Sequence, residues 1–242
     1  MLADARMKRS LAMLIVLCAC GGTSETPKTE NDVTPTPTAT HTGSRIAVQN
    51  EFGTIDDKVA AKVVNQLTAS IQKCHTQNLG RVEFLGGDLK FYVRIGADGH
   101  AKYVYFEDSS LGDREAEKCM LDILGGAQWP KPEGGPQAEL RSSFGFDAPS
   151  DVRQPTFWNS DKIAATIGKH QKDLDKCTDG VKAKFVVTAY VEPAGKDGKV
   201  LTAGVATSSQ EGAEKIDCLV DALKKIKMPS PGSWAAKVTF QL

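Results

Sequence analysis

The chain has 242 residues, of which 25% are charged and 7% aromatic, and its 30 basic residues balance its 30 acidic residues. A chain so close to neutrality offers no basic face for nucleic acid, so we expect no nucleic-acid partner. The low aromatic content predicts modest cores that would benefit from covalent cross-links.

The first residues have the features of an export signal. Three basic residues between positions 6 and 9 precede an apolar run, 11–17, that is too short for a membrane-spanning helix but suits the core of a signal peptide. We expect residues 1–19 to be removed, whether translation starts at Met1 or at Met7. The remaining chain would have 27 basic and 29 acidic residues, a net charge of −2.

The end of this run, Leu17-Cys18-Ala19-Cys20, resembles the bacterial lipobox, in which the last cysteine receives lipids such as palmitate and becomes the mature N-terminus. Ala19 is the small residue wanted before that cysteine. We therefore expect Cys20 to be lipidated and to anchor the protein to a membrane. An ordinary signal peptide cleaved nearby is the alternative.

Residues 20–50 are rich in threonine and proline and contain no aromatic residue. Such a segment cannot bury enough apolar surface to offset the entropy of ordering. The composition predicts a disordered tether, which as a flexible chain would hold the first domain about 30 Å from the membrane.

The rest of the chain repeats itself. Asp-Gly, Ser-Ser, Cys and Pro-x-Pro landmarks recur at a constant offset of 99, from Asp98, Ser109, Cys119 and Pro130 to Asp197, Ser208, Cys218 and Pro229. Self-similarity at a fixed offset indicates duplicated structural units. We expect a first domain over residues 51–148, a linker over 149–156, and a second, divergent domain over 157–242.

Four cysteines remain when Cys18 and Cys20 are set aside, and four cysteines allow three pairings. The repeat selects the pairing within each copy, Cys74 with Cys119 and Cys177 with Cys218. Export to an oxidising compartment favours structural disulfides over free thiols or a metal site. No Cys-x-x-Cys motif is present, so we expect neither a metal nor a cofactor.

Periodicity gives the same elements in each copy. A helical stripe ends at Cys74 and at Cys177, and alternating apolar residues then predict strands over 89–95 and 185–191. Asp98-Gly99 predicts a hairpin turn, and a helix precedes the Pro-x-Pro segment and a last strand. The predicted order is α-β-β-α-β, an α+β fold.

Several motifs in this order, above all Ser109-Ser110-Leu111-Gly112-Asp113, Cys119 and Trp129-Pro130-Lys131-Pro132, resemble the AgmX/PglI C-terminal domain, a TonB-like module of gliding-motility and other envelope proteins. The resemblance implies two tandem modules, each a three-stranded antiparallel sheet with two helices on one face. It also implies a two-membrane envelope, in which the outer membrane is favoured because Gly21 is not the aspartate that commonly signals inner-membrane retention. The second copy departs from the pattern, with Met228 in place of the tryptophan.

No catalytic motif appears, and the chain contains four histidines. We therefore expect no catalytic residue and a non-catalytic adaptor in the cell envelope, tied to envelope or motility machinery and to an envelope protein partner. The alternatives are a periplasmic binder of a glycan or small ligand, with a pocket lined by Trp129, Trp158 or the Tyr103 and Tyr105 face, and an enzyme acting on cell-wall polymer.

The candidate binding residues are Tyr92, Arg94, Trp129 and Lys131. The resemblance leaves one face of each sheet, and its edges, open to a partner strand. On the second copy that face would carry Lys184, Val186, Thr188 and Tyr190. Because these are less charged than Lys90, Tyr92 and Arg94, we expect the first copy to hold the main binding site and the second to act as a spacer or dimer contact.

Overall fold

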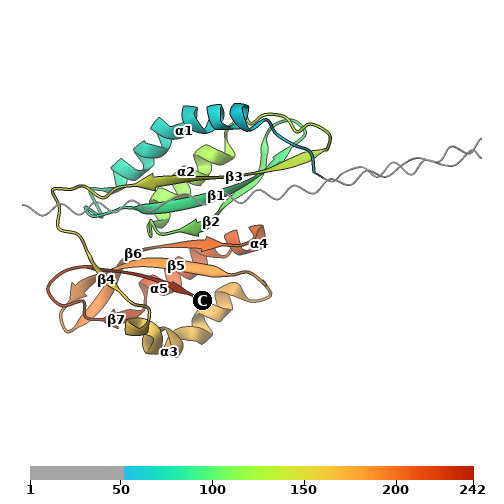
Figure 1. Ribbon diagram of the computed structural model, residues 1–242. Coiled ribbons are helices and arrows are strands. Elements are labelled where there is room, and N and C mark those ends of the chain that lie inside the picture. Colours follow the sequence, from blue (N-terminus) through green and yellow to red (C-terminus); the bar gives the residue numbers. More distant parts are fainter. Residues whose placement is uncertain (1–51) are drawn as a thin grey trace, which may run out of the picture. The chain divides into compact units, whose positions relative to one another are not determined.

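The computed structural model describes residues 52–242, so the predictions for the signal peptide, Cys20 and the tether lie outside the described residues. The described chain has the predicted α+β character. It contains a three-stranded antiparallel sheet and a five-stranded sheet, with helices packed against both (Figure 1). We refer to residues 52–148 as the N-terminal half and to residues 156–242 as the C-terminal half.

The N-terminal half has the predicted α-β-β-α-β order. Its elements are α1 (Asp57–Asn78), β1 (Gly87–Gly96), β2 (Ala101–Ser109), α2 (Arg114–Gly125) and β3 (Gln137–Phe146). The strands pair in the order β2-β1-β3, so that β1 is central and β3 lies at an edge (Figure 1).

The sequence of β1 explains why this sheet carries its helices on one face. Leu89, Phe91, Val93 and Ile95 are fully buried in one apolar cluster with residues of α1 and α2. Successive side chains of a strand point to opposite faces, so one face of β1 contributes these four residues to the core. The opposite face carries Tyr92 and Arg94.

The turn between β1 and β2 also follows the sequence. Gly99 has a φ of 84°, a conformation that suits glycine, and the Gly99 N–H donates a 2.9 Å hydrogen bond to the Gly96 carbonyl. The Asp98 carboxylate accepts a hydrogen bond from the His100 N–H, which closes the turn. The Asp-Gly pair therefore acts as a turn former here.

The C-terminal half differs from the expected three-stranded module. Its elements are β4 (Thr156–Trp158), α3 (Asp161–Thr178), β5 (Phe185–Ala194), β6 (Asp197–Thr207), α4 (Gln210–Ala213), α5 (Ile216–Lys224), β7 (Lys227–Pro229) and β8 (Ala236–Gln241). The sheet order is β4-β8-β5-β6-β7, with β4 parallel to β8. The expectation of three strands was wrong because two three-residue strands extend the sheet, and β4 starts inside the expected linker.

The outer face of this second sheet is not open, which corrects the expectation for Thr188 and Tyr190. Both side chains are fully buried. The Thr188 hydroxyl donates to the Ser109 carbonyl at 3.1 Å, and the Tyr190 hydroxyl donates to the Gly86 carbonyl at 3.2 Å. The N-terminal half covers this face, and Tyr190 joins its apolar cluster.

Both disulfides join the cysteines that the repeat pairs. Cys74 and Cys119 are bridged with their Cα atoms 5.8 Å apart, and Cys177 and Cys218 with their Cα atoms 5.5 Å apart. The first bridge connects α1 to α2, and the second connects α3 to α5. Each cross-link therefore ties together the two main helices of one half.

Candidate functional site

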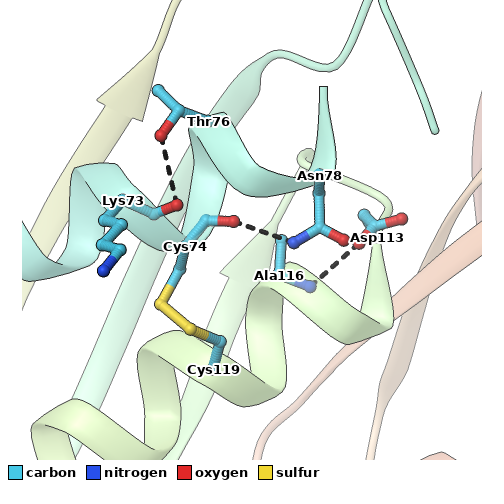
Figure 2. The surroundings of a disulfide bond; sticks show 7 residues. All are labelled: Lys73, Cys74, Thr76, Asn78, Asp113, Ala116 and Cys119. Carbon is cyan, nitrogen blue, oxygen red and sulfur yellow. Dashed lines mark hydrogen bonds between the residues drawn. A yellow bond between two sulfur atoms is a disulfide. The ribbon is translucent and has the colours of Figure 1, made fainter. Parts of the chain in front are cut away.

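The first disulfide lies beside a carboxylate that organises the start of α2. Figure 2 shows the Cys74–Cys119 bridge, with the Cys74 carbonyl accepting a 2.8 Å hydrogen bond from the Asn78 side chain. It also shows Asp113 accepting a 2.9 Å hydrogen bond from the Ala116 N–H, as an N-capping residue does. Asp113 is therefore the N-cap residue of α2.

The same carboxylate has a second role that the sequence did not indicate. Asp113 is fully buried, and its Oδ2 accepts hydrogen bonds from Arg81 at 2.6 Å and from the Thr202 hydroxyl at 2.7 Å. Thr202 belongs to β6 of the C-terminal half. A buried carboxylate needs a cation and hydrogen bonds to offset its desolvation, and here both halves of the chain supply them.

Glu117 is buried at the same contact. Its Oε1 accepts a 2.6 Å hydrogen bond from the Ser109 hydroxyl, and its carboxylate lies so close to Gly204 of β6 that a side chain there would collide with it. Burial raises the pKa of Glu117 to about 7, against the Ser109 hydrogen bond and the Arg114 charge, which lower it, while the Asp113 charge raises it further.

The outer face of the first sheet carries a compact network of aromatic and charged side chains. Tyr92 stacks on Tyr105 with ring centroids 4.9 Å apart, and the Arg141 guanidinium lies 4.6 Å from the centre of the Tyr92 ring. The Tyr92 hydroxyl donates to Glu139 and accepts from Arg94 Nε, both at 2.8 Å. The face is therefore held in one conformation by stacking and by charge-assisted hydrogen bonds.

The network explains the acid–base properties of its members. Burial raises the pKa of Tyr92 well above its usual range, so its hydroxyl keeps the proton that it donates. Burial opposes ionisation of Glu139, but hydrogen bonds from Tyr92 and Arg141 outweigh it and lower the pKa of Glu139. Glu139 is thus an anion that holds two arginines, Arg94 and Arg141, over the tyrosine rings.

The four candidate binding residues do not form one site. Tyr92 and Arg94 lie together on the outer face, but β1 is the central strand, so Tyr92 is not on a sheet edge. Trp129 is 2% exposed, and its ring N–H donates to the Leu124 carbonyl at 3.1 Å. Its ring therefore packs in the core, while Lys131 is exposed in the segment before β3.

The edges of the two sheets differ in what they offer. In the first sheet β2 lies against β6, whereas no other described strand pairs with the outer edge of the ten-residue β3. In the second sheet both edge strands, β4 and β7, have three residues. Short edge strands discourage pairing with a further strand, so β3 is the long edge in the described part of the chain.

The groups that β3 presents can be derived from its first residue. The Gln137 carbonyl accepts a 2.7 Å hydrogen bond from the Gly53 N–H, so it points away from β1. Alternate residues of a strand point their backbone groups to the same side, so the N–H groups of Glu139, Arg141 and Ser143 also point outward. The side chains of these three residues are exposed on the outer face of the sheet, beside this edge.

Other features bear on ligand classes. Within residues 52–242, no group of three or more metal-binding side chains is close enough to hold an ion. None of the helices described there has the length and apolar character needed to cross a membrane. A cavity of about 520 Å³ has Tyr103 on its wall, together with Arg114 and Glu214.

Comparisons with known proteins identify no relative: no family model, no curated protein and no solved structure matches the chain. The candidate site is therefore defined by its own geometry, the β3 edge beside the tyrosine–arginine face.

Proposed function

We propose that this chain is a non-catalytic interaction module of a bacterial cell envelope, held at the outer membrane through a lipid on Cys20. Its partner is an envelope protein that adds an extended segment to the edge of β3. The observation that carries the proposal is the backbone edge of β3, which no other strand among residues 52–242 pairs with and which lies beside a rigid face. The element order of the N-terminal half and the helix-to-helix disulfides support the resemblance to the TonB-like AgmX/PglI domain, which is part of this proposal.

Strand addition gives affinity through main-chain hydrogen bonds and specificity through neighbouring side chains. On β3 the outward N–H groups would supply the hydrogen bonds. Arg141, which is 55% exposed and rests on Tyr92, would contact the side chains of the added strand. Because Glu107 and Glu139 already pair with Arg141, the face presents both signs of charge and favours a partner strand of mixed charge.

The C-terminal half is proposed to brace the N-terminal half rather than to bind a second partner. Its sheet face is occupied by Ser109, Gly86 and Asp113, and both of its edge strands are short. Deleting the chain after Val152 would expose these contacts. Such a deletion would destabilise the binding half as well as remove the brace, so point substitutions on β3 give a cleaner test.

The test replaces Ser143 by proline and, as a matched control, by alanine. Proline is tolerated at an edge position whose N–H faces outward, but it removes the donor that an added strand needs. An envelope protein that is captured by the wild-type chain and by Ser143→Ala, and lost with Ser143→Pro at unchanged melting temperature, supports the proposal. Capture that persists with Ser143→Pro refutes binding along β3.

A further inference from the structure

A second site lies at the C-terminal end of β3, in a cavity of about 430 Å³ whose wall includes Gly145 and Phe146. Small-molecule sites typically have volumes of about 300–1,000 Å³. The wall combines apolar rings with a few charged and polar groups: Phe84, Phe157, Tyr190, Lys237, Asp88 and Asp147. Because Phe84 and Asp88 belong to the N-terminal half and Tyr190 and Lys237 to the C-terminal half, the cavity exists only when both halves are folded together.

Lys237 is the buried cation of this cavity. It is 8% exposed, and its Nζ donates a 2.6 Å hydrogen bond to the Gly86 carbonyl. The Nζ also lies 5.2 Å from the centre of the Tyr190 ring and 6.0 Å from that of Phe157. An ammonium group has three N–H donors, so a single carbonyl leaves donors for an anionic group of a ligand.

The charge state of Lys237 suits this role. Burial lowers its pKa to about 8, and the nearby Asp88 charge counteracts part of this shift. The amine is therefore mainly protonated at neutral pH and becomes neutral as the pH rises through this value.

Two carboxylates on the wall restrict the ligand. Asp88 and Asp147 are exposed side chains that line the cavity, and neither forms an ion pair with Lys237 among the described residues. One cation and two carboxylates give the wall a net charge of −1, which disfavours phosphate and other dianions. A ligand that carries an ammonium group as well as a carboxylate would complement both signs.

Part of the apolar wall of the cavity is exposed to solvent. Phe157 lines the cavity, and its side chain is 75% exposed. A ligand with a small apolar side chain would cover part of this ring and gain the free energy of removing it from water.

We propose that this cavity binds a small zwitterion of the amino-acid type, a free amino acid or a short peptide, with its carboxylate on Lys237 and its ammonium group near Asp88 and Asp147. The inference does not depend on strand addition at β3, because the charged groups that would hold the ligand, Lys237, Asp88 and Asp147, lie outside β3.

The test is calorimetric titration of the purified chain, in mild detergent, with L-alanine, D-alanine and dialanine, and with propionate and ethylamine as ligands that lack one charge. We expect saturable binding of an alanine enantiomer or of dialanine, and at least about 10-fold weaker binding of propionate and ethylamine, since a charged hydrogen bond is worth about 1.5–3 kcal/mol. Alanine against dialanine distinguishes the two sources of the zwitterion. No saturable binding of either, or equal affinity for propionate, overturns the proposal.

Substitutions locate the binding. Lys237→Met should weaken it at least about 10-fold, whereas Lys184→Met, at an exposed lysine of the same half, should leave it unchanged. If Lys237→Met does not fold, Phe157→Ser and Asp147→Asn carry the test, because both replace exposed side chains. Affinity should also fall as the pH rises through about 8. Unchanged binding in all of these variants would place the ligand elsewhere and refute the assignment.

Discussion

Thr202 of β6 donates a 2.7 Å hydrogen bond to the buried carboxylate of Asp113, which caps α2. The Asp113 side chain thus joins the start of α2, the Arg81 guanidinium and the sheet of the C-terminal half. The contact is polar and buried, so each partner depends on the others for its hydrogen bonds.

We expect Asp113→Ala to lower the free energy of unfolding by about 3 kcal/mol, because it removes a cap and leaves Arg81 and Thr202 without their acceptor. The control is Asp56→Ala at the exposed cap of α1, which should cost about 1 kcal/mol. Urea denaturation measures both. Equal losses in the two variants would show that the contact with Thr202 contributes nothing.

Glu117 should make stability depend on pH. Its pKa is raised from 4.5 when unfolded to about 7 when folded, so the folded state binds the proton more tightly. The contribution of Glu117 to stability is therefore fully present below pH 4.5 and is lost as the pH rises to about 7, by about 3 kcal/mol.

The side chain in Glu117→Gln carries no charge at any pH. This variant should therefore not lose the stability that the wild type loses as Glu117 ionises. Its stability relative to the wild type should increase with pH over the same interval, as followed by denaturation at several pH values. A constant difference across that interval would mean that Glu117 does not titrate there. Ser109, Asp113 and Arg114 face this carboxyl group and are retained in both proteins.

Replacing Cys177 and Cys218 together by alanine should cost about 2–5 kcal/mol, because the 41-residue loop between them becomes free in the unfolded chain. A proteolytic digest of the wild type without reductant should release peptides that link 74 to 119 and 177 to 218. Linked peptides that join one half to the other would contradict the two bridges.

Tyr92→Phe should cost about 1–2 kcal/mol, since the hydroxyl bridges Arg94 and Glu139. Tyr105→Phe is the matched control, because the Tyr105 ring stacks on Tyr92 but its hydroxyl makes no hydrogen bond to another described residue. Thermal unfolding compares the two. An equal loss in the two variants would show that the hydroxyl bridge from Tyr92 to Arg94 and Glu139 does not contribute to stability.

Cys20→Ser should prevent lipidation and release the protein from the membrane fraction, because a serine cannot accept the thioether-linked lipid. Detergent partitioning and sucrose-gradient fractionation measure this. A variant that stays in the detergent phase would show that the anchor lies elsewhere.

The features that the sequence predicted correctly are those encoded by local periodicity or by the repeat. Leu89, Phe91, Val93 and Ile95 lie in the core as their alternation predicts, although Tyr92 between them is also buried, on the other face. Each cysteine occupies the same place in its copy. The sheet extensions escaped prediction because β4 and β7 each have three residues, too few to show alternation.

The candidate site was harder to predict because it depends on contacts between distant segments. The central place of Tyr92 follows from the strand order β2-β1-β3, which alternation along one strand does not specify. Thr188 and Tyr190 look like surface residues in their strand, and it is the end of β2 at Ser109 and the segment at Gly86 that cover them. Lys237 gives no sequence signal at all, because its burial comes from the other half of the chain.

Among the four cysteines of residues 52–242, the disulfides join neighbours in chain order, Cys74 to Cys119 and Cys177 to Cys218. A chain that is threaded through a membrane from its N-terminus would present Cys74 and Cys119 to the oxidising side before Cys177 emerges. The first bridge can therefore close while Cys177 and Cys218, the incorrect partners, have not yet crossed the membrane. Order of arrival would then select the native connectivity without later reshuffling, which is an advantage for a protein whose two halves bury polar groups against each other.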